Sequence, residues 1–255
     1  MLFTRSVNKN LILCVITLFV ILPFNANAIL VGTYTSPPFS MNEDGEDIGL
    51  ATESLRALLD KSGIKDYKII DYPLARGMVE LKYGRIDILY PYVTFLKKSK
   101  EEYILIGPIS KYRVSLFVRK DYIGQVSIDA MKDLALGAER GSIGDKVLAQ
   151  HNINVEQSTQ EVSCLKMVLA ERIVACAMGT LSGKYAAAIN NIYEQLRYVE
   201  TDFYADMYLA LGPSVPSEVV KKLQTTFKEL KRENYFEKQQ LDYEHKFNIF
   251  IKSLS

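Results

Sequence analysis

Apolar and polar residues follow two alternating periods along most of the chain. Short apolar runs bounded by turn residues predict strands, at residues 29–34, 67–73, 85–90, 104–108, 113–121, 135–139, 153–157, 172–178 and 206–212. Apolar residues at helical spacing predict helices between them, at residues 48–63, 74–84, 127–134, 145–152, 160–171 and 216–233. Such alternation is typical of α/β proteins with largely parallel sheets, and its restart near residue 121 predicts two similar lobes.

The first 28 residues have the three parts of a secretory signal peptide. Arg5 and Lys9 precede an apolar run of 14 residues at positions 11–24, and Ala26 and Ala28 form an A-x-A cleavage pattern. The run is short for a membrane span. We therefore predict cleavage after Ala28 and a periplasmic mature chain. An uncleaved N-terminal anchor is the alternative.

Composition and charge exclude several classes of function. The net charge of the 255 residues is +1, and −1 without the first 28, so no basic surface for nucleic acid is indicated. His151 and His245 lie far apart, and no Cys/His cluster has the spacing of metal ligands. No dinucleotide-binding, P-loop, metalloprotease or hydrolase motif is present. We therefore expect a non-enzymatic protein without a cofactor or a metal ion.

The two cysteines beyond the signal peptide leave two states open. Export to an oxidising compartment would allow Cys164 and Cys176 to pair. Cys164 lies early in the predicted helix at 160–171, and Cys176 lies in the strand after it. A helix packed on a sheet keeps its backbone about 10 Å away, beyond the roughly 4.4–6.8 Å that separates the Cα atoms of a disulfide. The pattern favours two buried thiols over a disulfide.

The order of segments from about residue 29 to 250 resembles the extracellular solute-binding proteins of family 3. The resemblance rests on "SPPFSMNEDGEDIGLATESLRALL", "RGMVELKYGRIDI", "GPISKYRVSLFVRKD", "LALGAERGSIGD", "LKMVLAERIVACAM" and "YLALGPSVPSEVVKKLQTTFKEL". It implies a type 2 periplasmic-binding-protein-like fold, in which two α/β lobes joined by two crossover strands close around a small ligand. Lobe 1 would comprise residues 29–118 and 203–255, and lobe 2 residues 119–202. The hinges would lie near residues 118–121 and 200–203.

The resemblance also indicates where the ligand would lie, beyond the carboxyl ends of the strands. A serine or threonine that follows a lobe 1 strand in this family falls on Thr94, and the Gly-Ser turn of lobe 2 falls on Gly141–Ser142. The arginine that usually binds an α-carboxylate falls on Ser99, and the acidic residue that usually pairs with an α-amino group falls on Gly179. Both charged anchors for an amino acid are thus absent from their usual positions.

Other side chains near these segments could replace the missing anchors. Tyrosines and Phe39 could cover an apolar or planar ligand, and Arg76 or Arg140 could meet an anionic group. Lys97, Lys98 and Lys100 are interpreted as a solvated turn. The predicted ligand-binding residues are Tyr34, Phe39, Arg76, Tyr90, Tyr92, Thr94, Arg140, Gly141, Ser142 and Thr180. The ligand would carry an anionic or strongly accepting group and would need no α-amino group, because Gly179 offers no countercharge.

Three functions remain compatible with the sequence. The first is a binding protein that captures a small polar, anionic or amino-acid-like solute for an ABC importer or a sensor. The second is an enzyme on the same fold, because a few members of the family are dehydratases that act on cyclic acids. It would need a general acid or base, and Glu139 is the carboxylate that the sequence places at the cleft. The third is a signalling or interaction module whose cleft has degenerated.

Overall fold

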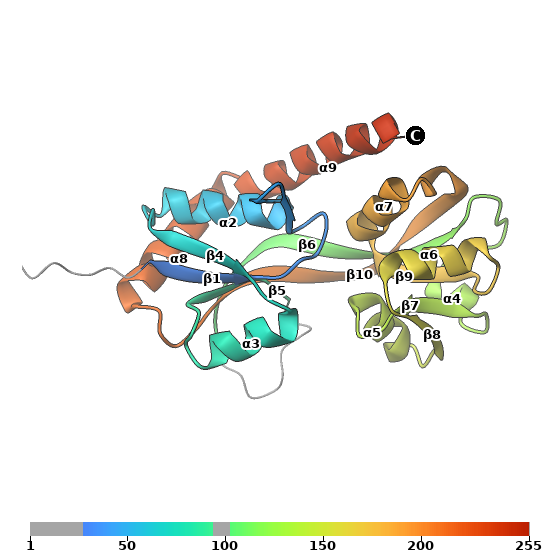
Figure 1. The fold of residues 1–255 in the computed structure, drawn as a ribbon, viewed down its shortest axis with the longest axis horizontal. Coiled ribbons are helices and arrows are strands. Elements are labelled where there is room, and N and C mark those ends of the chain that lie inside the picture. The colour runs from blue at the N-terminus through green and yellow to red at the C-terminus, as the bar shows by residue number, and fades with distance from the viewer. Residues whose placement is uncertain (1–27, 94–102, 255) are drawn as a thin grey trace, which may run out of the picture.

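The chain folds into two α/β lobes that lie end to end and are joined by two long strands (Figure 1). The structure, a computed structural model, describes residues 28–93 and 103–254. Residues 1–27 of the predicted signal peptide, Thr94, Ser99 and the lysines of the predicted solvated turn lie outside the described residues. The two-lobed α/β architecture with two crossover strands confirms the fold class that the sequence predicts.

A single eight-stranded sheet passes through both lobes in the order β4-β1-β5-β10-β6-β9-β7-β8. Its strands are β1 (Ile29–Thr33), β4 (Tyr67–Asp71), β5 (Ile88–Val93), β6 (Ile104–Arg119), β7 (Leu136–Glu139), β8 (Val155–Ser158), β9 (Ala175–Gly179) and β10 (Leu196–Leu211). Strand β1 is parallel to β4 and β5, and β7 is parallel to β8 and β9. Strands β6 and β10 run antiparallel to each other and to their outer neighbours. Each lobe therefore has parallel strands at its outer side.

Helices cover the sheet in both lobes (Figure 1). Lobe 1 carries α2 (Leu50–Lys61), α3 (Leu74–Lys82), α8 (Ser217–Arg232) and α9 (Tyr235–Leu254). Lobe 2 carries α4 (Ile128–Met131), α5 (Ile143–Gln150), α6 (Glu161–Leu169), α7 (Thr180–Ile189) and the 3₁₀ turn η2 (Tyr193–Gln195). Helix α8, predicted at residues 216–233, buries a stripe of apolar side chains, namely Val220, Leu223, Phe227 and Leu230. Among the described helices, none combines the length and the apolar character needed to cross a membrane.

The crossover between the lobes lies in the middle of β6 and β10, which have 16 residues each. Strand β6 already pairs with β9 of lobe 2 from Val114 onward, and β10 pairs with β5 of lobe 1 from Met207 onward. The pairing of β10 with β6 shifts register between Glu200 and Tyr204. Strand β6 therefore passes from lobe 1 to lobe 2 near residues 111–113, and β10 passes from lobe 2 to lobe 1 near residues 201–206. The exact lobe boundaries stay a prediction, because a strand that pairs in both lobes has no single residue at which one lobe ends.

Strands β2 and β3, helices α7 and α9 and the turn η2 have no counterpart among the helices and strands that the sequence predicts. Asp44 and Gly45, at φ 51° and 86°, form a two-residue turn between β2 (Met41–Glu43) and β3 (Glu46–Ile48). Helix α7 is buried on most of its surface, so its sequence lacks an amphipathic period. In α9, apolar residues occur on the exposed side of the helix as well as on the buried side. The sequence of α9 therefore shows no clear amphipathic period.

Helix α9 contacts both lobes along its length (Figure 1). On lobe 1 the Tyr243 hydroxyl donates to the Pro38 carbonyl oxygen, with the two oxygens 2.8 Å apart. On lobe 2 the Phe247 ring stacks on Tyr185 with the ring centroids 6.1 Å apart. Asn248 accepts a hydrogen bond from Lys184, whose side chain is buried. The C-terminal helix therefore connects the lobes beside the two crossover strands.

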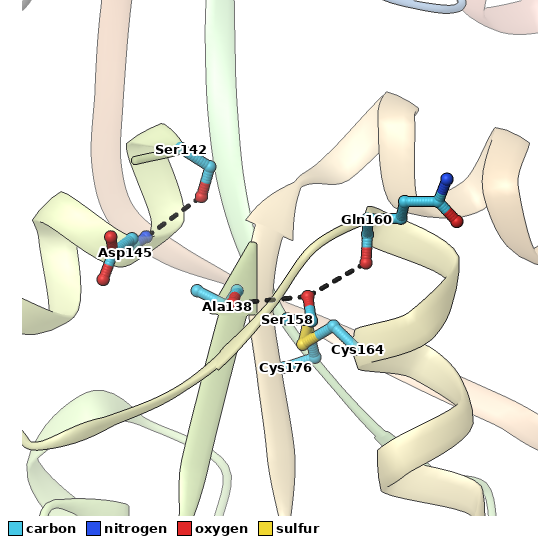
Figure 2. The surroundings of a disulfide bond; sticks show 7 residues. All are labelled: Ala138, Ser142, Asp145, Ser158, Gln160, Cys164 and Cys176. Carbon is cyan, nitrogen blue, oxygen red and sulfur yellow. Dashed lines mark hydrogen bonds between the residues drawn. A yellow bond between two sulfur atoms is a disulfide. The ribbon is translucent and has the colours of Figure 1, made fainter. Parts of the chain in front are cut away.

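Cys164 and Cys176 form a disulfide, so the preference for two thiols was wrong (Figure 2). Their Cα atoms are 5.9 Å apart. The distance of about 10 Å applies to the helix axis, whereas a Cα atom on the side of the helix that faces the sheet lies about 2.3 Å closer. Small residues reduce the distance further: a Cβ placed on Gly137 of β7 would lie 3.4 Å from the Cys164 sulfur. The disulfide joins α6 to β9.

Candidate functional site

The Gly141–Ser142 turn lies at the carboxyl end of β7 and begins α5. Gly141 has φ +74°, and its backbone N–H donates to Asp145 Oδ2 at 2.8 Å. Ser142 is the N-cap of α5, and its Oγ accepts from the backbone N–H of Asp145 at 3.1 Å (Figure 2). Because a hydroxyl that accepts a hydrogen bond keeps its own proton, Ser142 can still donate to a ligand.

Arg140 is exposed, and its side chain is bound at the edge of the lobe 2 sheet. Its Nε donates to Gln157 Oε1 at 2.9 Å, and Gln157 lies on β8, the last strand of the sheet. Gln157 in turn donates to Asp145 at 3.3–3.4 Å. The Arg140 guanidinium therefore belongs to a polar network on the lobe 2 surface, next to the Gly141–Ser142 turn.

Thr180 begins α7, directly after β9, and its hydroxyl contacts the crossover strand β6. Its Oγ1 lies 2.7 Å from Ser115 Oγ and 3.3 Å from the Arg113 carbonyl oxygen. Thr180 and Phe39 of lobe 1 both line a cavity of ≈ 130 Å³, to which Arg113, Lys184 and residues of α9 also contribute. The structure thus brings two of the predicted residues, one from each lobe, to the same small cavity.

Tyr112 joins the two lobes at this point, and the sequence analysis had not named it. Its ring lies 5.5 Å from the Phe39 ring, centroid to centroid, in lobe 1. A Cβ atom placed on Gly179 of lobe 2 would lie 2.2 Å from the Tyr112 hydroxyl oxygen. Tyr112 therefore fills the space that a side chain at position 179 would need. Only a long-range contact reveals this role, because Tyr112 has the pattern of an ordinary strand residue.

The predicted aromatic residues of lobe 1 lie in two different parts of the core. Tyr90 and Phe39 belong to the main core, whereas Tyr92 packs against Tyr103 in a second cluster, with the ring centroids 5.8 Å apart. Between the paired positions Leu89–Ala210 and Tyr92–Tyr208, β5 has two residues and β10 has one. This β-bulge turns Tyr90 and Tyr92 to opposite faces of the sheet. Both tyrosines are fully buried.

Burial raises the pKa of Tyr34, which follows β1, and the nearby Tyr90 hydroxyl raises it further. Burial likewise raises the pKa of Tyr90, and the nearby hydroxyl groups of Ser110 and Ser54 oppose this shift. The pKa of Tyr112 is raised first by burial and then by Glu161, with a smaller contribution from Tyr34. These three tyrosine hydroxyls are therefore neutral at ordinary pH.

The guanidinium group of Arg76 is already paired with a carboxylate of its own helix. It pairs with Glu80 one turn along α3, and Arg85 pairs with the same carboxylate. Glu80 is buried, and the hydrogen bond from Arg85 is the main cause that lowers its pKa. Arg76 is thus the exposed partner of a buried carboxylate.

Two carboxyl groups, Glu139 and Glu161, lie at the carboxyl edge of the lobe 2 strands. Glu139 ends β7 and is paired in register with Ser158, and Glu161 begins α6 three residues later. Burial, with a contribution from the charge of Glu139, raises the pKa of Glu161 to about 8. Burial also raises the pKa of Glu139. The sequence indicated Glu139, but Glu161 was missed because an acidic residue in the first turn of a helix is explained by the helix dipole alone.

A larger cavity than the one beside Thr180 lies at the C-terminal helix. It has a volume of ≈ 640 Å³ and is lined by α9, the β2–β3 hairpin and Tyr185 of α7. None of the predicted ligand-binding residues lines it. Within residues 28–93 and 103–254, no three ligand-type side chains lie close enough together to hold a metal ion.

Comparison with known proteins supports the architecture. No family model matches the chain. The sequence is 28% identical over 155 residues to the probable amino-acid-binding protein YxeM of Bacillus subtilis, and the match covers 58% of each protein. The chain thus spans less than two thirds of the length of this curated relative.

Solved structures match over most of the chain. The ligand-binding core of GluR0 in complex with L-glutamate has a TM-score of 0.72 at 15% identity, over 86% of this chain and 99% of its own. A histidine kinase sensor domain with similarity to periplasmic binding proteins has a TM-score of 0.70 at 17% identity, over 85% and 95%. The arginine-, lysine-, histidine-binding protein ArtJ of Geobacillus stearothermophilus has 0.65 at 15% identity, over 85% and 95%. These comparisons confirm the predicted resemblance to solute-binding proteins, and at these identities the structural likeness shows the fold.

Proposed function

We propose that this chain is a solute-binding protein that captures a small, polar, amino-acid-like solute between its lobes and presents it to an ABC importer or a sensor. The observation that carries the proposal is the junction at Tyr112, where the Phe39 ring of lobe 1 and Gly179 of lobe 2 contact the same side chain. Phe39 and Thr180 line one cavity there, although they belong to different lobes. A ligand held at this junction would contact both lobes and favour their closed arrangement.

The lobe 2 side of the junction suits an anionic end of the solute. The Ser142 hydroxyl and the N-terminus of α5 offer hydrogen-bond donors and a partial positive charge. Tyr34 of lobe 1, which is partly exposed, offers a hydroxyl and a ring face, and Phe39 offers a second ring at the cavity. A carboxylate on lobe 2 with an organic body against these rings is the arrangement that these groups favour.

A ligand screen tests this proposal. Thermal unfolding would be followed with amino acids, amines, organic acids and sugars, because a ligand at 100 times its Kd stabilises the folded state by about 2.7 kcal/mol. Calorimetry on Ser142→Ala would then show weaker binding of the compound that the screen identifies. Ser127→Ala is the matched control, because Ser127 is also an N-cap in lobe 2, on α4. Equal affinity in both variants would place the ligand away from the Gly141–Ser142 turn.

Closure of the lobes gives a second test. With ligand, small-angle scattering should show a smaller radius of gyration, because rotation about the crossover strands brings the lobes together. We place the hinge of β6 near residues 111–113 instead of the expected 118–121, because Val118 is already paired with Ala175 of lobe 2, and the hinge of β10 near residues 201–206, which overlaps the expected 200–203. An unchanged scattering profile at saturating ligand would contradict closure.

Export to the periplasm belongs to the same proposal. We expect cleavage after Ala28, so the intact mass of the periplasmic protein should correspond to a chain that begins at Ile29. A full-length product retained in the membrane would refute export by cleavage.

An enzyme is the second candidate, and Glu161 is the observation that favours it. A carboxyl group with a pKa of about 8 beside a second carboxyl group can act as a general acid near neutral pH. Incubation with cyclic hydroxy acids, followed by mass spectrometry, would reveal loss of water. Turnover that Glu161→Gln abolishes would favour this candidate over a binding protein.

A further inference from the structure

Tyr112 of β6 lies where the carboxyl edges of the strands of the two lobes meet. Phe39, in the loop after β1, has its ring centroid 5.5 Å from that of Tyr112. Gly179 ends β9 in lobe 2, and a Cβ atom on it would lie 2.2 Å from the Tyr112 hydroxyl oxygen. Ligands of open α/β sheets bind beyond the carboxyl ends of the strands. The Tyr112 side chain therefore occupies part of the space that a solute between the lobes would use.

The ring of Tyr112 is held from both lobes. The side chain is 9% exposed, and Phe39, which packs on it from lobe 1, is 2% exposed. On the lobe 2 side, a Cβ atom on Gly179 would lie 2.4 Å from Cζ and 2.9 Å from Cε2, so the ring lies directly against a backbone without a side chain. Burial is the main cause that raises the pKa of Tyr112, and the nearby Ser182 hydroxyl of α7 opposes the rise. Close packing on two lobes leaves the ring little room to turn aside.

The order of strands sets the distance from Tyr112 to the Gly141–Ser142 turn. In lobe 2, β9 lies between β6, which carries Tyr112, and β7, which the turn follows. The register of β7 and β9 places Gly179 level with Arg140, directly before the turn. Because the Tyr112 hydroxyl reaches the end of β9 at Gly179, about one strand spacing, roughly 4.8 Å, separates it from the end of β7. A solute with its acceptor group on the turn then has little space for a side chain on the Tyr112 side.

The cavity at this junction is small as well. Phe39 and Thr180 line a volume of ≈ 130 Å³, whereas pockets for drug-sized ligands measure about 300–1,000 Å³. Lys111 and Arg113, the neighbours of Tyr112 along β6, line the same cavity. The free volume at the junction therefore suits a solute with few non-hydrogen atoms.

We infer that Tyr112 limits the size of the solute, so that the protein binds amino-acid-like compounds with short side chains and excludes those with long ones. This inference rests on the proposed function and names the size class of the solute. Tyr112 is a specificity-determining residue, because its ring closes the space beyond the Gly141–Ser142 turn. A longer side chain meets the ring, which would have to move against Phe39 or against the backbone at Gly179.

Calorimetry with two series of compounds tests the inference. The first series runs from glycine through L-alanine, L-2-aminobutyrate and L-norvaline to L-norleucine, and the second runs from acetate to hexanoate, one methylene group at a time. Each compound is measured on the wild-type protein and on Tyr112→Ala, Tyr112→Leu and Tyr204→Ala. Tyr204 is the control, because it lies on the other crossover strand, β10, and is 54% exposed.

We expect the affinity of the wild type to fall at least tenfold from the shortest compounds that bind to L-norleucine or hexanoate. Tyr112→Ala should bind these longest compounds at least tenfold more tightly than the wild type, because each methylene group that enters the freed apolar space strengthens binding about fourfold. Tyr112→Leu keeps part of the apolar volume and should bind them with intermediate affinity. Tyr204→Ala should show the wild-type dependence on length.

The outcomes separate the inference from the proposed function. A wild type that binds long compounds as tightly as short ones, or the same dependence on length in wild type and Tyr112→Ala, would overturn the inference and leave a solute-binding protein. Binding of no compound by any variant, in these series or in the wider screen, would overturn both. Urea unfolding shows whether each variant is folded, and if Tyr112→Ala is not, the comparison of Tyr112→Leu with the wild type decides in the same way.

Discussion

The junction between Tyr112 and Gly179 leads to a prediction about the substitution Gly179→Ala. The new Cβ atom would lie 2.2 Å from the Tyr112 hydroxyl oxygen and 2.4 Å from Cζ, so the ring must move by about an ångström to restore ordinary contact. The ring has little freedom to do so, because Tyr112 is 9% exposed and packs on Phe39. Overpacking of this kind costs about 1–3 kcal/mol, and we expect Gly179→Ala to lower the free energy of unfolding by that amount.

Other effects of the alanine are small or cancel in a double-mutant cycle. Gly179 has φ −56°, which alanine adopts without strain, and it is the N-cap of α7, where alanine is slightly worse than glycine. The same cap effect is present in every background. In a Tyr112→Ala background the clash is gone, so Gly179→Ala should cost about 1–3 kcal/mol less than in the wild type. In a Tyr112→Phe background the clash with Cζ remains, and most of the cost should remain with it.

Urea unfolding of the six proteins in this cycle gives the coupling energies directly. The aromatic near-ultraviolet signal would follow the tertiary structure, and the far-ultraviolet signal would follow the helices. The reasoning is refuted if Gly179→Ala has the same effect in all three backgrounds. A wild-type background that tolerates alanine without loss of stability would equally show that Tyr112 does not fill the position.

Three further predictions concern other parts of the chain. Replacing Cys164 and Cys176 together by alanine should lower the free energy of unfolding by about 3 kcal/mol, because the bond closes a loop with a sequence separation of 12. Urea unfolding of wild type with dithiothreitol should match this variant, and equal stability with and without reductant would contradict the prediction. The ligand-free protein should lose stability as pH rises from about 5 to about 8, because the raised pKa of Glu161 makes the folded state bind the extra proton. Thermal unfolding across this range should show a flatter profile for Glu161→Gln, and an identical slope would count against it. Phe247→Ala should cost about 3 kcal/mol in urea unfolding because the ring joins α9 to lobe 2, whereas Leu241→Ala, 66% exposed on the same helix, should change stability by less than about 0.5 kcal/mol.

The amphipathic helices and strands of both lobes were predictable because their patterns are local. In α8, Val220, Leu223, Phe227 and Leu230 recur at helical spacing, and this spacing alone decides which face is buried. The alternation of strands and helices, together with the order of segments, was sufficient to predict two lobes and two crossover strands. The helix α7 was not predictable in this way, because a segment buried on most sides carries no periodic signal.

For the candidate site, too, the sequence predicted some features and not others. The Gly141–Ser142 turn and Thr180 were named from the sequence because each directly follows a strand, and the carboxyl ends of parallel strands meet at one edge. That reasoning gives the edge on which a residue lies but not what its side chain contacts. It therefore could not show that Arg76 is bound to Glu80.

Other features depended on the tertiary structure alone. The bulge in β5 separates Tyr90 from Tyr92, although their spacing along the chain suggested a common face. The 5.9 Å between the Cα atoms of Cys164 and Cys176 follows from how closely one helix lies on one sheet. The sequence by itself determined the strands of the main sheet and the amphipathic helices, with the faces they bury, because those preferences act between residues two to four positions apart. Tertiary structure decided which side chains meet, such as Phe39 and Tyr112 or Cys164 and Cys176, because register shifts and packing distances add up over the whole fold and are encoded in no short stretch of the chain.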